Sequence, residues 1–249
     1  MEEPENDLSS TTLRKMLEGI SEKQKDSQII VATHNSMIAS RLNLNNVLWI
    51  TENGVKALSG VDEKVANFFV KADDNAFLQL LLSKKVFLVE GATEFLLLPH
   101  FYQQLTGKSI EEDGISVISC NGISYKKYLE IAEKTSKKIA VITDNDKKQK
   151  RINLAKKYNE KKTLQHIYMA DCTDDWTWEI CMYNINQAVL DEMITVQAGA
   201  EYKYHGESYG AVPGKMLNNK VDVAYQMLTS GATFEIPQYV KDAIEWLRE

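Results

Sequence analysis

Two apolar stretches of the chain each end in carboxylate side chains. The first leads into Glu90, and Glu94 follows four residues later. The second leads into Asp144, with Asp146 two residues beyond it. Carboxylate oxygens suit a hard divalent cation such as Mg²⁺. If both stretches are strands of one open sheet, their ends converge where α/β proteins bind ligands, so the pattern predicts a metal site there.

The elements around these acids alternate between strand and helix. Apolar, β-rich stretches predict strands, and longer amphipathic or leucine-rich stretches predict helices. We expect Pro99 to distort the first helix, because proline removes a backbone donor. The order βαβαβ predicts an α/β fold with a parallel sheet and right-handed crossovers. The expected strands are 85–89, 115–119, 139–143 and 165–169, and the expected helices are 93–106, 124–136, one basic helix after residue 146, and one that begins within 171–179 and ends at about 194.

Composition indicates an ordinary globular chain. The 249 residues are 44% apolar and 26% charged, which is enough for one large domain or two small ones. No apolar run reaches the length of a membrane span, and residues 1–5 are acidic where a signal peptide is basic. We therefore expect a cytoplasmic protein with no membrane partner.

Positive charge is concentrated in one part of the chain. Residues 126–162 contain thirteen Lys and Arg residues against five acids, whereas residues 171–201 contain seven acids and no Lys or Arg. A basic segment beside a carboxylate cluster could guide a polyanion toward a bound metal. The alternative is that these lysines are the solvated faces of amphipathic helices.

The N-terminal region carries a second pattern. Residues 2–5 read Glu-Glu-Pro-Glu, a helix is expected from Ser9 or Ser10 to about residue 26, and an apolar strand at 28–33 leads into His34. This order resembles the back half of an ABC-type ATPase head. The resemblance implies that Glu2 lies on the Mg²⁺ side, that Glu3 polarises the hydrolytic water and that His34 senses the γ-phosphate. The alternative for His34 is a satisfied polar residue at a strand end.

The ATPase pattern is incomplete. A phosphate-binding loop of the form Gly-x4-Gly-Lys-Ser/Thr is absent, because Gly107-Lys108-Ser109 ends a helix and Tyr102 stands where the first glycine belongs. We expect residues 1–83 to be a truncated ABC-type lobe, completed by a hairpin at 47–58 and short helices at 62–71 and 75–83. ATP would act only if another chain supplied the missing half.

The spacing of Val-Glu-Gly and a later strand-Asp-x-Asp resembles the Toprim domain of topoisomerases, primases and certain nucleases. After a truncated ABC head, the chain resembles the overcoming-lysogenization-defect (OLD) family of ATPase-nucleases, which includes the Gabija antiphage nuclease. The resemblance covers nearly the whole chain and implies that residues 84–249 are a Rossmann-like Toprim nuclease domain with a helical C-terminal extension.

The OLD resemblance also assigns roles to residues. Glu94 matches the second acid of the first motif, and Thr177 with Glu179 matches a later Ser/Thr-x-Glu motif, although Trp178 replaces the usual aliphatic residue. Lys220, with Lys215 as its rival, matches a lysine that precedes a helix and would neutralise the phosphate in the transition state. The implied ligands of two Mg²⁺ or Mn²⁺ ions are Glu90, Glu94, Asp144, Asp146, Thr177 and Glu179, and the implied catalytic residues are Glu90, Asp144 and Lys220.

The sequence thus favours a metal-dependent DNA endonuclease in phage or mobile-DNA defence, acting as a homo-oligomer or with a partner that completes the ATPase. The alternative is a catalytically silent DNA- or partner-binding fragment of a split OLD protein. Each acid alone could be a helix cap or a solvated turn. Trp176 and Trp178 are interpreted as packing residues, not as platforms on which bases stack. Residues 234–247 predict an amphipathic closing helix that packs on the Toprim core or on a partner.

Overall fold

The structure is a computed structural model of the whole chain. It describes residues 1–6, 8–23, 28–33, 38, 46–51, 54–57, 64–65, 76–120, 124–197 and 201–249. Internal contacts divide the chain into two units. The first contains residues 1–82 and 126–136, and the second contains residues 83–125 and 137–249.

The described part of the first unit contains three helices, a hairpin and one isolated bridge. Leu13 and Leu17 of the predicted N-terminal helix are buried with Ile38. Among the described residues, the predicted strand at 28–33 forms an isolated parallel bridge between Ala32 and Glu2. The predicted hairpin is confirmed, as is the helix before residue 83. The described elements are α1 (Ser10–Lys23), β1 (Leu48–Thr51), β2 (Gly54–Ala57), α4 (Ala76–Leu82) and α6 (Tyr125–Thr135).

The second unit is built on a parallel sheet, as the sequence predicts. Its four strands lie in the order β4-β3-β5-β6, and every neighbouring pair is parallel. The two central strands are almost wholly apolar and buried, which is typical of a sheet covered on both faces. The strands are β3 (Lys85–Val89), β4 (Ile115–Ser119), β5 (Lys138–Ile142) and β6 (Gln165–Tyr168).

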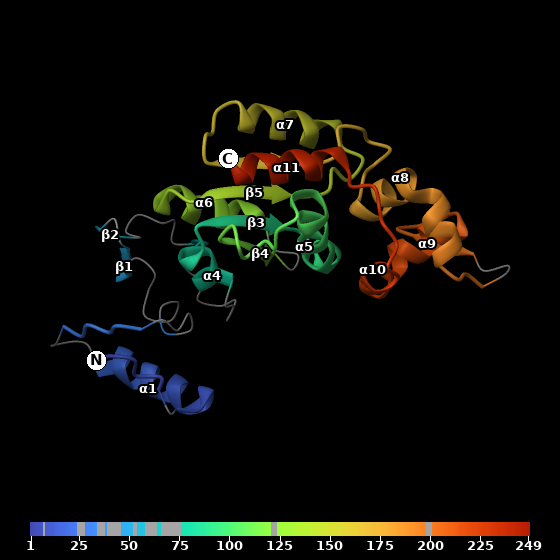
Figure 1. Cartoon of the computed structure of the whole chain (residues 1–249). Coiled ribbons are helices and arrows are strands. Elements are labelled where there is room, and N and C mark those ends of the chain that lie inside the picture. Colours follow the sequence, from blue (N-terminus) through green and yellow to red (C-terminus); the bar gives the residue numbers. More distant parts are fainter. Residues whose placement is uncertain are drawn as a thin grey trace. The chain divides into compact units, whose positions relative to one another are not determined.

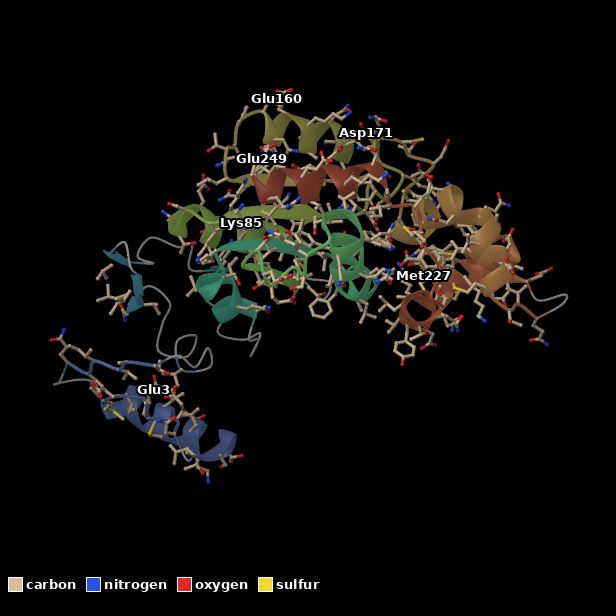
Figure 2. The ribbon with its side chains drawn as sticks, viewed as in Figure 1. Glu3, Lys85, Glu160, Asp171, Met227 and Glu249 are labelled. Atoms are coloured by element: carbon tan, nitrogen blue, oxygen red, sulfur yellow. The ribbon has the colours of Figure 1, made fainter. Side chains whose placement is uncertain are left out.

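Helices of this unit share one apolar core with the sheet. The C-terminal helix packs on β5 and β6, which confirms that it closes the core. Lys85 Nζ at the start of β3 donates to the carbonyl of Arg248 at 2.7 Å, and Figure 2 shows Lys85 and Glu249 at this same end of the sheet. The helices are α5 (Ala92–Thr106), α7 (Gln149–Asn159), α8 (Trp178–Met193), α9 (Ala211–Asn218), α10 (Lys220–Thr229) and α11 (Gln238–Arg248).

Three of these helices lie beyond the carboxyl ends of the strands. Figure 1 shows α8, α9 and α10 grouped past the arrowheads of β3 and β5. A short antiparallel hairpin, β7 (Tyr202–Tyr204) and β8 (Glu207–Tyr209), joins this group through contacts with α9. The sequence analysis does not predict the hairpin. These helices and the hairpin therefore cover the carboxyl end of the sheet, where Glu90 and Asp144 follow their strands.

Two helices differ in detail from the expectation. Helix α5 continues through Pro99, because burial of Leu97, Leu98 and Phe101 outweighs one missing backbone hydrogen bond. Helix α8 is kinked at Asn186, whose side chain exchanges two hydrogen bonds with the backbone of Glu235, at 2.7 and 3.0 Å.

No helix among the described residues has the length and apolar character needed to cross a membrane.

Candidate metal and phosphodiester site

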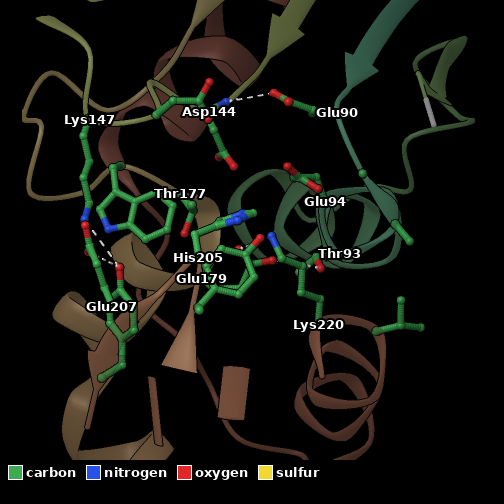
Figure 3. A pocket seen from close by; sticks show the side chains of 17 residues that line it. Glu90, Thr93, Glu94, Asp144, Lys147, Thr177, Glu179, His205, Glu207 and Lys220 are labelled. Atoms are coloured by element: carbon green, nitrogen blue, oxygen red, sulfur yellow. Dashed lines mark hydrogen bonds and ion pairs between the residues drawn. The ribbon is translucent and has the colours of Figure 1, made fainter. Parts of the chain in front are cut away.

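A pocket of about 590 Å³ opens at the carboxyl ends of the strands (Figure 3). It combines the acids that follow β3 and β5 with side chains from α5, α8, α10 and the hairpin. Its lining consists of Glu90, Gly91, Ala92, Thr93, Glu94, Asp144, Asp146, Lys147, Trp176, Thr177, Glu179, Tyr204, His205, Glu207, Tyr209, Lys220 and Val221.

Glu90 lies at the end of β3 and is held by the neighbouring strand. Its Oε2 accepts hydrogen bonds from the Thr143 hydroxyl and, at 3.2 Å, from the backbone N–H of Asp144. These contacts cross between the adjacent strands β3 and β5, whose last residues Val89 and Ile142 are register partners. The two predicted strand-end acids are therefore neighbours in space.

Glu94 is buried in the first turn of α5, with 5% of its surface exposed. Loss of hydration raises the pKa of Glu94 to about 7, and the nearby charges of Glu179 and Glu90 act in the same direction. Gly91 permits this arrangement, because a Cβ atom there would lie 3.1 Å from Glu94 Oε2. The glycine of the Val-Glu-Gly motif thus leaves room for the second acid.

Asp144 points toward the same space from the end of β5. Its Oδ1 accepts a hydrogen bond of 2.9 Å from the backbone N–H of Trp178, at the start of α8. Burial raises the pKa of Asp144 well above its ordinary value, and the charges of Glu94, Glu179 and Glu90 raise it further. Glu90 and Glu179 thus act on both Glu94 and Asp144, and we call these four acids the carboxylate cluster.

Glu179 completes the carboxylate cluster from α8. Its Oε1 accepts from the Thr93 hydroxyl at 3.2 Å, and its Oε2 lies 2.9 Å from Lys220 Nζ. Burial alone would lower the pKa of Lys220, but the charge of Glu179 and this hydrogen bond raise it above the ordinary value. Thr177 is buried at the N-cap of α8, where its hydroxyl accepts from the N–H of Ile180 at 3.3 Å.

Asp146 lines the pocket but its carboxylate has another partner. The Arg151 guanidinium contacts it directly, and Lys148 Nζ lies 3.9 Å away. Asp146 and Lys147 both have left-handed backbone conformations, with φ of 52° and 58°. The turn is fixed by a 3.2 Å hydrogen bond from the Asp146 N–H to the carbonyl of Trp176. The structure therefore sets Asp146 apart from the carboxylate cluster.

The remaining predicted residues lie elsewhere. Lys215 Nζ donates to the carbonyl of Thr195 at 2.6 Å, so of the two rival lysines the pocket contains Lys220. Glu2 and Glu3 belong to the first unit, where the N–H of Glu3 donates to the carbonyl of Ala32 at 2.8 Å. His34 falls outside the described residues.

Sequence reasoning missed the hairpin side of the pocket. Tyr204, His205, Glu207 and Tyr209 all come from β7, β8 or the turn between them. His205 and Gly206 have φ of 49° and 83°, the pair of positive values that a type I′ hairpin turn requires. The signal available in the sequence was His-Gly between two short tyrosine-containing segments, which is weaker than Asn-Gly or Asp-Gly.

The donor set fits a hard cation in its chemistry. Four carboxylates share a partly buried space that Lys220 contacts through Glu179, and the raised pKa values of Glu94 and Asp144 indicate negative charge that is not fully compensated. Divalent cations relieve such repulsion. Among the described residues, no three Asp, Glu, His or Cys side chains are arranged so that they could hold a metal ion. The carboxylates instead accept hydrogen bonds: Glu90 from Thr143, Glu179 from Thr93 and Lys220, and Asp144 from the N–H of Trp178.

A comparison with known proteins finds a family match for the part of the chain that contains Glu90, Glu94 and Asp144. Residues 81–146 match the model of the TOPRIM domain of overcoming lysogenization defect protein-like proteins. The chain is also similar to the Old nuclease of Escherichia phage P2, with 25% identity over 133 residues. That alignment covers 49% of this chain and 23% of the phage protein, so the chain spans less than a quarter of that relative.

Among solved structures, the chain is similar to the C-terminal region of the OLD protein of Xanthomonas campestris pv. campestris. One structure, phased with platinum, aligns with a TM-score of 0.43 and 15% identity over 68% of this chain and 94% of the other. A second, phased with iodine, aligns with a TM-score of 0.39 and 17% identity over 67% of this chain and 94% of the other.

Proposed function

Residues 81–146 are a Toprim domain of the OLD type, and on that premise we propose that the chain is a metal-dependent DNA endonuclease. The observation that carries the proposal is the carboxylate cluster of Glu90, Glu94, Asp144 and Glu179. These acids come from four parts of the chain, and the charges of Glu90 and Glu179 help to raise the pKa of Glu94 and of Asp144. Buried like charges are costly unless a cation compensates them, so the arrangement suits a protein that works with a divalent metal.

In this proposal Glu90, Glu94, Asp144 and Glu179 hold one or two Mg²⁺ or Mn²⁺ ions. Such ions supply Lewis acidity that activates water and stabilises the leaving oxygen of a phosphodiester. Lys220 would turn from Glu179 toward the scissile phosphate and neutralise its developing charge. Thr93 and the N–H of Trp178 orient Glu179 and Asp144 through hydrogen bonds of 3.2 and 2.9 Å. Thr177 supports the same geometry by capping α8, and Asp146 by its pairing with Arg151.

DNA is the proposed substrate because lysine side chains lie close to these acids. Lys147 lines the pocket, and Lys148 and Lys150 at the start of α7 are exposed. Lysines in such positions attract a phosphate backbone and make its binding dependent on salt. The similarity to the Old nuclease supports the same assignment. We place the activity in defence against phage or mobile DNA as part of this proposal.

A second proposal concerns residues 1–83, which we assign to the end of an ABC-type ATPase lobe. The observation that favours it is the parallel bridge between Glu2 and Ala32, since it places the acidic segment beside the segment that precedes His34. ATP would then require a homo-oligomer or partner that supplies a phosphate-binding loop. If the chain is silent without that partner, it would act as a DNA-binding module.

The test is cleavage of supercoiled plasmid in Mg²⁺, Mn²⁺, Ca²⁺ or EDTA. Wild type should produce nicked or linear DNA only with an active metal, and Asp144→Ala should lower the rate at least about 1,000-fold, since its carboxylate is central to the proposed site. Asp242→Ala, which removes an exposed carboxylate on α11, is the matched control and should cleave like wild type. Metal-independent cleavage, or full activity in Asp144→Ala, would contradict the nuclease proposal. A folded wild type that binds DNA without cutting it would favour the silent module.

A further inference from the structure

One side of the pocket is aromatic. Trp176 lies 6.0 Å from Tyr204 and 6.2 Å from Tyr209 between ring centroids, with interplanar angles of 38° and 40°. We call these three side chains the aromatic cluster. All three line the pocket and remain partly exposed, unlike Trp178, which is 1% exposed and stacks on Phe101 in the core. Burial confirms the interpretation of Trp178 as a packing residue, whereas for Trp176 that interpretation stays a prediction.

Two lysines flank the aromatic cluster. Lys147 Nζ lies 4.9 Å from the Trp176 ring centroid and 5.9 Å from that of Tyr209. Lys220 Nζ lies 5.7 Å from the Tyr204 centroid and also contacts Glu179 of the carboxylate cluster. Figure 3 shows Lys147 and Lys220 on opposite sides of the pocket. Positive charge thus stands on both sides of exposed rings, next to the acids that would hold a metal.

The hairpin has anchors that do not involve these ring faces. Gly214 of α9 packs so closely that a Cβ there would lie 2.2 Å from Cβ of Tyr202. Asn218 Nδ2 donates to the carbonyl of Lys203 at 3.3 Å, and Lys147 contacts the carboxylate of Glu207. Because backbone and polar contacts already fasten the hairpin, the partly exposed rings are available for another role.

We propose that the aromatic cluster stacks on an unpaired base of the DNA strand whose phosphate enters the carboxylate cluster. In a duplex the faces of each base are covered by its neighbours, whereas an unpaired base can turn a face toward an aromatic ring. Lys147 and Lys220 match the phosphates on either side of that nucleotide in charge. The preferred substrate is therefore a single strand, flap or frayed end. This inference rests on the proposed nuclease function and specifies its substrate.

Ring-removing and ring-retaining variants provide the test. Tyr204→Leu and Trp176→Leu remove a stacking face, while Tyr204→Phe and Trp176→Phe keep one. The probe is an oligonucleotide carrying 2-aminopurine, whose fluorescence falls on stacking, used as a single strand and as a duplex in Ca²⁺. The leucine variants should bind the single strand about tenfold more weakly, the duplex less than about twofold more weakly, and should lose the quenching. The phenylalanine variants should bind both probes as wild type does.

Cleavage of the same two substrates in Mg²⁺ or Mn²⁺ separates this inference from the proposed function. If wild type cuts both and the leucine variants change both rates equally or not at all, stacking is overturned and the nuclease stands. If wild type binds the single strand with ring-dependent quenching but never cuts it, stacking stands and the nuclease is overturned. Should Trp176→Leu unfold at a lower temperature, Tyr204→Leu on the hairpin decides the matter, and unchanged binding by that variant would overturn the inference.

Discussion

The carboxylate cluster and the aromatic cluster share one pocket but are built in different ways. Glu94 and Glu179 are buried, at 5% and 3% exposure, in the first turns of α5 and α8. Tyr204 and Tyr209 are partly exposed on a hairpin only three residues long on each side. Buried acids gain strong electrostatic coupling from low hydration, whereas exposed rings keep a free surface for a ligand. On the two proposals above, the carboxylate cluster would carry out the chemistry and the partly exposed aromatic cluster would select the substrate.

The largest effect is expected at Glu94, where burial disfavours the charged carboxylate. Replacing this carboxyl group with a neutral amide should remove that cost. Between the ordinary pKa of 4.5 and the folded-state pKa of about 7, the folded protein holds a proton that the unfolded chain has lost. The stability of the metal-free protein therefore falls as pH rises through this window, by about 3 kcal/mol from this residue alone. Glu94→Gln should remove that share of the decline.

Urea unfolding in EDTA at pH 5 and pH 8 measures the effect. Between pH 5 and pH 8, the free energy of unfolding of wild type should fall by about 3 kcal/mol more than that of Glu94→Gln. Glu245→Gln, an exposed residue on α11, should follow wild type at both pH values. Equal pH dependence in Glu94→Gln and wild type would show that the acids do not carry this cost.

A smaller effect is expected from Lys220, which compensates the buried charge of Glu179. The side chains are 36% and 4% exposed, so solvent weakens the penalty for losing the pair. Lys220→Met should destabilise the metal-free protein by about 1–2 kcal/mol, below the value for a fully buried pair. Mn²⁺ should restore part of this loss, because a cation would take over the compensation.

Thermal unfolding with EDTA or Mn²⁺ checks this expectation. Lys215→Met is the control, since Lys215 lies outside the pocket and its ammonium group donates to the backbone carbonyl of Thr195. A melting temperature for Lys220→Met equal to that of Lys215→Met would contradict the proposed role of Lys220 in balancing the acids.

The same contrast explains what the sequence could predict. The apolar strands before Glu90 and Asp144 are long and uniform, so their type, their parallel pairing and the meeting of their acids could be predicted. The hairpin could not, because six strand residues around a His-Gly turn give little periodicity, and its position depends on packing against Gly214. The sequence also did not reveal the partner of Asp146, because the contact of that carboxylate with Arg151, in the first turn of α7, depends on the fold.

Asp146 provides the smallest and most discriminating prediction. It has the motif position of a metal ligand, but its side chain is 42% exposed and pairs with Arg151 and Lys148. Ion pairs with such exposure contribute less than about 1 kcal/mol, so Asp146→Asn should change unfolding stability by that amount or less. Cleavage should fall less than about fivefold, against about 1,000-fold for Asp144→Ala. Plasmid cleavage across a Mn²⁺ titration is the measurement. A loss comparable to that of Asp144→Ala, reversed by high Mn²⁺, would place Asp146 among the metal ligands and show that Arg151 releases it when the cation binds.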